Sequence, residues 1–255
     1  MKKRVEIKGI HYWALYFILP LALLIAWECA DLAGTIHPYS FPSIKSIWNT
    51  VVEYGVNGKL INNIIVSFLR VIEGFFVALV IGVGLGILVS VFERVNILTD
   101  FIIQIVRPIP PIAWIPLAIL WFGIGESSKI FIIFLGAFFP IFVNTVDGIR
   151  SVDSKYFELG QVYEVPKREL ITKVIIPGAL PAILTGIRLG IGSAWICVVA
   201  AEMIGATSGV GYMLSDGRSL SRPDIVVLGM LIVGIIGKIM DDILKLLRDK
   251  IVTWI

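Results

Sequence analysis

The sequence predicts an all-α membrane protein with six transmembrane helices. Of its 255 residues, 57% are apolar and 16% are charged, whereas soluble domains carry about 45–50% and ~25%. The mean hydropathy is +0.91, so a soluble domain of this composition could not cover its surface with polar side chains. No stretch alternates apolar and polar residues as the strands of a barrel do, which leaves helices to satisfy the backbone inside lipid.

Six stretches approach or exceed the roughly 20 apolar residues that a helix needs to cross a bilayer. The second is preceded by an amphipathic segment from Leu60, and the third is interrupted by prolines. A cleaved signal peptide is the alternative for the first stretch, but no small-x-small cleavage site follows it, so we expect a retained anchor. The six predicted spans are 13–32, 71–91, 97–122, 129–146, 179–205 and 225–243.

The distribution of Lys and Arg predicts the orientation. If the N-terminus is cytoplasmic, thirteen of the 22 basic residues lie in cytoplasmic segments and five in external ones, which follows the positive-inside rule. Both termini are then cytoplasmic. The chain divides into a cytoplasmic segment (1–12), the first span (13–32), an external loop (33–59), a core of five spans (60–248) with an internal loop at 149–178, and a cytoplasmic tail (249–255).

The external loop contains one predicted helix. Phe41-Pro42-Ser43 is typical of a helix start, and the apolar residues after it follow helical spacing. The helix lies either on the membrane surface or packed on the bundle, and the sequence does not distinguish the two.

Four prolines lie within nine residues at membrane depth, between Pro108 and Pro116. They remove amide donors and forbid a regular helix there. Non-helical backbone survives at this depth only in a protein interior or beside a watery cavity. A broken helix of this kind often lines a transport pathway, and a packing kink is the alternative. The candidate pathway residues are Arg107, Pro110, Pro111 and Trp114, with Arg188 and Glu202 as further polar candidates in the fifth span.

The internal loop is the longest polar stretch on the cytoplasmic side and predicts two short helices, 153–163 and 167–175. Pro166 suits the first position of the second helix. In the first helix, Tyr156, Leu159 and Tyr163 project on one side and Glu158 on another. Such a hairpin could dock a cytosolic partner, and a solvated loop with local helix is the alternative.

Motifs for chemistry are missing from the sequence. The two histidines lie at membrane margins without metal-ligand spacing. No Gly-Lys-Ser/Thr phosphate loop occurs, and a net charge of +3 is too small for a nucleic-acid binder. We therefore expect no enzyme activity, no catalytic, cofactor or metal site in this chain, and no nucleic-acid partner.

Several motifs resemble one family of transporters. Glu158-Leu159-Gly160, followed nineteen residues after Glu158 by Pro177, resembles the EAA loop of ABC importer permeases. The stretch from Arg107 to Gly125 is similar to the signature of the nitrate/sulfonate/taurine permeases. Ala179-Leu180-Pro181-Ala182 and Ala200-Ala201-Glu202-Met203-Ile204 fit the same subfamily.

The resemblance implies a type I ABC importer permease fold in the cytoplasmic (inner) membrane, with the internal loop as a coupling helical hairpin. It implies a second permease copy, most simply a homodimer, two cytosolic ABC ATPase subunits that bind ATP and Mg, and an external solute-binding protein. The implied substrates are small organic or inorganic anions, of the taurine, alkanesulfonate, nitrate or bicarbonate class. The implied coupling residues are Tyr156, Glu158, Leu159, Gly160, Tyr163, Glu164, Pro166 and Pro177.

One position departs from that family. Six residues after the Glu of the loop the family usually has glycine, where this chain has Glu164. Because glutamate adopts a positive φ less readily than glycine, we expect the turn to shift to Val165-Pro166.

Two rival functions are a secondary carrier and a membrane-embedded enzyme. A secondary carrier would normally have about ten or more spans and an ion-coupling site, and a membrane-embedded enzyme would need a deep Ser/His pair or carboxylate dyad.

Overall fold

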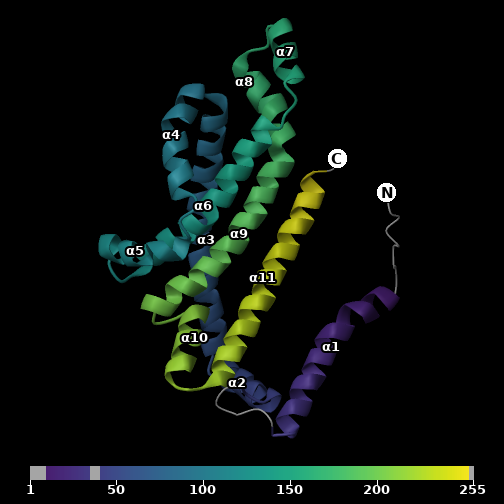
Figure 1. The fold of residues 1–255 in the computed structure, drawn as a ribbon, viewed down its shortest axis with the longest axis vertical. Helices are drawn as coiled ribbons and strands as arrows, with labels where there is room; N and C mark the ends of the chain where they lie inside the picture. The colour runs from purple at the N-terminus through teal and green to yellow at the C-terminus, as the bar shows by residue number, and fades with distance from the viewer. Residues whose placement is uncertain (1–9, 35–40, 253–255) are drawn as a thin grey trace.

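The computed structural model describes residues 10–34 and 41–252, with side chains from Tyr16 onward. Every regular element in these residues is helical (Figure 1). Residues 1–9 and 253–255 of the predicted terminal segments, and 35–40 of the external loop, lie outside the described residues. The elements are α1 (Ile10–Leu32), α2 (Ile44–Val56), α3 (Lys59–Val91), α4 (Glu93–Val106), the 3-10 turn η1 (Pro111–Trp114), α5 (Ile115–Phe122), α6 (Glu126–Arg150), α7 (Lys155–Val162), α8 (Lys167–Leu170), the π-helical turn η2 (Ile171–Ile175), α9 (Ile176–Gly205), α10 (Val210–Ser219) and α11 (Pro223–Ile251).

The core lies where α3, α6 and α9 pack together. Its fully buried side chains include Val71, Ile133 and Val198. Glycines allow the helices to approach closely: a Cβ on Gly186 of α9 would lie 2.6 Å from the Cβ of Asn144 on α6. Such contacts gain dispersion energy along the whole interface, which is how helices associate without a hydrophobic drive in lipid.

Within residues 10–34 and 41–252, four helices are long and apolar enough to cross a membrane, and five if the bent pair at the proline-rich segment counts as one span. The four agree with the second, fourth, fifth and sixth predicted spans. They extend further than predicted, since α3 begins at Lys59, the fifth runs from Lys167, and α11 continues to Ile251. The amphipathic segment from Leu60 is therefore the first turns of the same helix.

The third predicted span is broken in the middle. α4 and the η1–α5 segment meet at an angle of 90°, and α5 projects away from the bundle (Figure 1). The break follows from the sequence, because Pro108, Pro110 and Pro111 cannot donate backbone hydrogen bonds. Gly123 then turns the chain into α6 with a φ of +77°, which glycine adopts without steric cost.

The predicted helix of the external loop is α2, and it packs on the bundle. Ser43 is its N-cap and accepts a hydrogen bond from the Ser46 amide at 3.1 Å. Ile47 and Tyr54 are buried against α10 and α11. Arg222 donates to Glu53 at 3.0 Å, which lowers the pKa of that carboxyl. The helix therefore has a fixed place on the bundle, while its Trp48 is exposed.

α1 coincides with the first predicted span. Its described side chains are largely apolar and exposed, and it stands beside the bundle, approaching it at the end near α2 (Figure 1). Trp27 makes this attachment, donating to the Pro42 carbonyl at 3.1 Å and packing on Phe41 with ring centroids 4.6 Å apart. The hairpin of α7 and α8 lies at the opposite end of the molecule from α2 and α10 (Figure 1).

Candidate functional site: a groove along α6 and a helical hairpin

Two cavities lie next to each other along α6, and Arg107 and Val143 line both. The outer cavity, of about 450 Å³, has α9 as one wall through Leu189 and Ser193. The inner cavity, of about 520 Å³, is bounded by α4 and the C-terminal half of α6. The lining residues of α6 recur three or four positions apart, from Leu135 to Arg150, as one face of a helix requires. The two cavities form one groove, hereafter the α6 groove.

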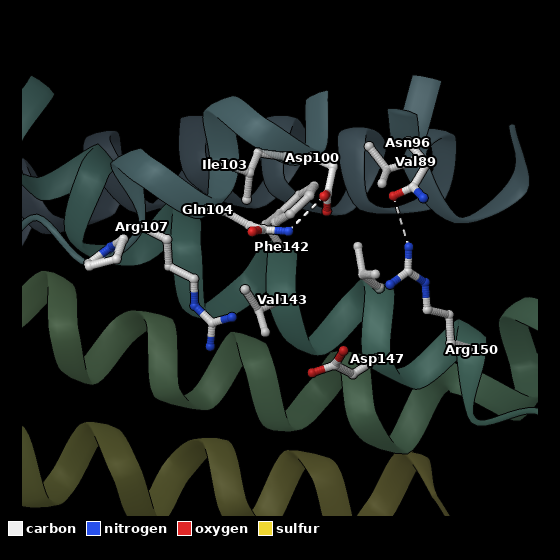
Figure 2. A pocket seen from close by; sticks show the side chains of 12 residues that line it. Val89, Asn96, Asp100, Ile103, Gln104, Arg107, Phe142, Val143, Asp147 and Arg150 are labelled. Carbon is white, nitrogen blue, oxygen red and sulfur yellow. Dashed lines mark hydrogen bonds between the residues drawn. The ribbon is translucent and has the colours of Figure 1, made fainter. Parts of the chain in front are cut away.

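Arg107 occupies the middle of the α6 groove. It is the C-cap of α4, where the proline break begins, and its side chain is exposed. Its guanidinium makes no hydrogen bond or ion pair with any of the described residues. Figure 2 shows its guanidinium directed into the inner cavity. An unpaired guanidinium at this depth is costly unless water or a ligand solvates it, so its position marks the groove as polar space.

The other residues of the break have different surroundings. Pro111 lines the outer cavity, and Pro110 is exposed just before η1. Trp114 packs against Trp121 with ring centroids 6.5 Å apart and adjoins the buried cluster around Ile115 and Ala118. The break thus contributes Arg107 and Pro111 to the groove, while Trp114 supports α5.

Arg188 faces away from the α6 groove. Its Nε and Nη2 donate to Asp241 of α11 at 2.5 and 2.6 Å. The pair closes a small cavity of about 20 Å³ between α9 and α11. Lys238, four residues before Asp242 on α11, pairs with that neighbour, which leaves Asp241 to Arg188. Arg188 therefore joins two helices and does not line the groove.

Glu202 is fully buried in a cluster of polar side chains at the end of the bundle that carries α10. Its carboxylate accepts hydrogen bonds from Ser67 and Arg70 of α3, each at 2.8 Å, and from the Gly211 amide at 2.9 Å. Arg70 also donates to Glu126, the first residue of α6, at 2.5 and 2.7 Å. These bonds connect α3, α6, α9 and α10.

The cluster also caps α10. Asn63 and Ser67 accept from the amides of Gly209 and Val210, at 2.9 and 2.8 Å, and the carboxylate of Glu202 meets the next amide. Negative charge at a helix N-terminus is stabilising. The sequence analysis missed Asn63, Ser67 and Arg70. Their spacing of four and three residues places them on one face of α3, and polar residues on one face of a membrane helix were the available signal.

The hairpin between α6 and α9 agrees with the two predicted helices, with differences at their ends. α7 begins at Lys155, whose amide donates to the Asp153 carboxylate at 3.0 Å. Pro166 is the N-cap of α8, one residue before the predicted position. The second helix does not end at 175, because the π-helical turn η2 continues it into α9. The hairpin is thus joined to α9 without a loop.

The expected shift of the turn to Val165-Pro166 is wrong. Glu164 itself adopts a φ of +51°. The Val165 amide donates to the Gly160 carbonyl at 2.9 Å, and the Glu164 amide donates to the Gln161 carbonyl at 3.1 Å, which together form a Schellman motif. Satisfying these carbonyls offsets the steric cost of glutamate. Gly160 is buried against Leu170, whose Cδ2 would lie 2.9 Å from an added Cβ.

The hairpin presents large apolar side chains to its surroundings. Tyr156 and Leu159 are each 50% exposed and Tyr163 is 75% exposed. Glu158 is exposed in the first turn of α7, and Pro177 is half-buried at the start of α9. A hairpin that leaves such side chains uncovered in a polar segment is suited to contact another protein.

No group of His, Cys, Asp and Glu that could hold a metal occurs in residues 10–34 and 41–252.

Comparison with known proteins identifies close relatives. The family described as "Binding-protein-dependent transport system inner membrane component" matches residues 78–252. A putative ABC transporter permease of Methanocaldococcus jannaschii is 42% identical, covering 99% of this chain and 97% of its own. A putative aliphatic sulfonates transport permease of Bacillus subtilis is 39% identical (95% and 88%), and a taurine transport system permease of Escherichia coli is 32% identical (92% and 87%).

Solved structures show the same fold. A chain of the MetNI methionine ABC transporter matches with a TM-score of 0.61 and 19% identity, covering 75% of this chain and 97% of its own. The all-helical fold with four to five candidate spans is therefore that of an ABC importer permease.

Proposed function

Since the chain belongs to the inner membrane component family of binding-protein-dependent transport systems, we propose that it imports small anions with energy from a separate ATPase. The chain is a multi-pass permease subunit of the inner membrane, and its family lacks an ATPase domain, as the sequence predicted. We propose sulfonates, taurine, nitrate or bicarbonate as substrates, because relatives are named as sulfonate, taurine and bicarbonate permeases.

The observation that carries the proposal is the exposed hairpin of α7 and α8. Its tip bears Tyr156, Leu159 and Tyr163 uncovered, and its second helix continues into α9, which lines the α6 groove. A subunit that holds the tip and moves it would therefore tilt a wall of the groove. Glu158, Gly160, Glu164, Pro166 and Pro177 shape this hairpin. We propose two ATPase subunits that bind ATP and Mg as the partners, giving alternating access by rigid-body motion.

The path itself is proposed to be the α6 groove. The groove is open on one side in a single chain, and a second copy of the permease facing it would close it from lipid, which favours a homodimer. Arg107 and Pro111 line it, with Pro110 and Trp114 shaping the break. Arg188 and Glu202 act on it indirectly by fixing α9.

We further propose the remaining parts of the assignment. α1 is the first of six spans, both termini are cytoplasmic, and the external solute-binding protein delivers substrate at the end that carries α2 and α10. Lipid covers the exposed apolar faces. The hairpin and the C-terminal end of α11 lie toward the same end of the molecule (Figure 1), which supports a cytoplasmic C-terminus.

The test separates coupling from folding. Glu158→Lys, or deletion of Tyr156–Tyr163, is expected to prevent co-purification of the ATPase while the permease still inserts in the membrane. Glu169→Lys, an exposed reversal on α8, serves as the matched control. Co-purification of an intact complex from the deletion variant would refute the proposal. Uptake that collapses with an uncoupler but survives ATP depletion would instead indicate a secondary carrier.

A further inference from the structure

The inner cavity holds four charged side chains, two of each sign. α4 contributes Asp100 and Arg107, and α6 contributes Asp147 and Arg150. Figure 2 shows the two arginines toward opposite ends of the cavity and the two aspartates between them. The order follows from the antiparallel course of α4 and α6, which sets the end of one helix beside the middle of the other. The formal charge of the cavity is therefore zero, with its positive and negative groups separated.

No ion pair joins any two of these four residues within the described chain. Asp100 accepts from the Gln104 amide at 2.6 Å, and Arg150 donates to the Asn96 oxygen at 2.9 Å. The side chains of Arg107 and Asp147 have no hydrogen-bond or ion-pair partner among the described residues.

Some charged groups elsewhere in the bundle do form ion pairs. Arg70 meets Glu126 and Glu202, and Arg188 meets Asp241. Charges inside membrane segments normally pair with one another or face a pathway. Four charges that share a cavity but remain apart are left with hydrogen-bonding capacity for a bound molecule.

We propose that the inner cavity is a ligand site of the permease itself, matched to a small zwitterion that carries an oxyanion and an ammonium group. This inference rests on the proposed importer function and narrows its substrate class. A guanidinium binds a sulfonate or carboxylate through two parallel hydrogen bonds, while Asp100 or Asp147 accepts the ammonium group. A simple anion would gain the same contact with an arginine and would be repelled by the aspartates.

The remaining walls suit a short carbon chain. Phe142 and Val146 of α6 and Ile103 of α4 line the cavity beside the charged groups. A volume of about 520 Å³ lies within the range of roughly 300–1,000 Å³ of small-molecule sites. The cavity is larger than a zwitterion whose charged groups lie four or five bonds apart, so water molecules complete the solvation of the bound ligand. Weak binding of this kind suits a pathway, where a ligand must also leave.

The test uses the permease with its ATPase subunits in lipid nanodiscs, without the solute-binding protein. Binding of 2-aminoethanesulfonate and of ethanesulfonate, which differs by the missing amine, is measured by calorimetry. We expect the zwitterion to bind about tenfold tighter. Asp100→Asn/Asp147→Asn is expected to remove the preference, and Arg107→Gln to weaken both ligands. Asp242→Asn, an exposed aspartate on α11, is the matched control.

Asp147→Asn alone guards against a folding defect, since Asp147 is exposed and unpartnered; it is expected to reduce the preference at an unchanged melting temperature. Equal affinities for the two sulfonates, or a preference that survives the double substitution, would overturn the proposal. Retention of zwitterionic phospholipid by the wild-type complex that the same variants lose, with no sulfonate bound, would identify a lipid site and overturn it too.

ATP-dependent uptake with the binding protein is measured in parallel, so that a failed site and a failed function are distinguished. Uptake of either sulfonate without discrimination in the cavity refutes only the zwitterion site. Absence of ATP-dependent uptake of every candidate anion refutes the importer function on which the site rests.

Discussion

Removing the guanidinium of Arg70 tests whether the cluster around Glu202 holds together the end of the bundle where α3, α6, α9 and α10 meet. Arg70 is 6% exposed and Glu202 is 1% exposed. Arg70→Met keeps most of the side-chain volume but deletes the donors to Glu126, to Glu202 and to the Ser208 carbonyl, the last at 2.7 Å. Glu202 would then be left buried with hydrogen bonds from Ser67 and one amide but no opposite charge.

The expected loss is about 3–5 kcal/mol in the free energy of unfolding, the range for removing one partner of a buried ion pair. Glu202→Gln is expected to cost less, because it leaves Arg70 paired with Glu126 and removes the buried charge along with the contact. In the double variant the two losses are expected to be less than additive, since the uncompensated charge is then absent.

Unfolding of the purified complex by SDS in mixed micelles, followed by circular dichroism, measures these differences. Arg248→Met is the control, because Arg248 pairs only with the adjacent Asp249 and surface changes usually stay within about 0.5 kcal/mol. A loss below about 1 kcal/mol for Arg70→Met, or additive losses in the double variant, would contradict the reasoning that the cluster is a coupled structural unit.

Three further outcomes follow from the geometry. Glu164→Gly is expected to raise the free energy of opening of the α7 amides, measured by hydrogen exchange, by about 0.5–1 kcal/mol, because glycine removes the cost of a positive φ. Glu164→Val is expected to lower that free energy of opening. Gly186→Ala is expected to cost about 1–3 kcal/mol by forcing α9 from α6, measured against Gly192→Ala, whose Cβ meets nothing within 4 Å. The Glu53–Arg222 pair lowers the pKa of Glu53, so the small contribution of the pair to the free energy of unfolding is present at neutral pH and is lost as pH falls below about 4. Glu53→Gln is expected to flatten the acid side of the curve of stability against pH, and an unchanged acid side would show that the pair contributes nothing.

The sequence predicted most of the fold because lipid enforces simple rules. Four of the six predicted spans, the second, fourth, fifth and sixth, were confirmed because length and apolarity identify them, and the break at Pro108 to Pro116 was found because proline lacks an amide donor. The helix ends were less accurate. The start of α3 at Lys59 and the end of α11 at Ile251 lie in amphipathic turns that hydropathy alone does not assign to a membrane helix.

The hairpin shows how local preference can be overridden. Glutamate disfavours a positive φ, so the sequence predicted a shifted turn. The structure keeps Glu164 in that conformation because two backbone carbonyls of α7 gain partners there, and because Gly160 lets Leu170 pack closely. Satisfying buried backbone groups outweighed the intrinsic preference of one side chain.

Composition and spacing by themselves determined that this chain is a helical membrane protein, where most of its spans lie and which polar loop folds as a helical hairpin, because those properties depend on neighbours in the sequence. Which charges pair was decided by tertiary structure alone. Arg188 meets Asp241 fifty-three residues away and Glu202 meets Arg70 at a separation of 132, while Arg107 and Asp147 remain unpaired in one cavity. Such pairings depend on how α3, α4, α6, α9 and α11 pack, and no local pattern records that packing.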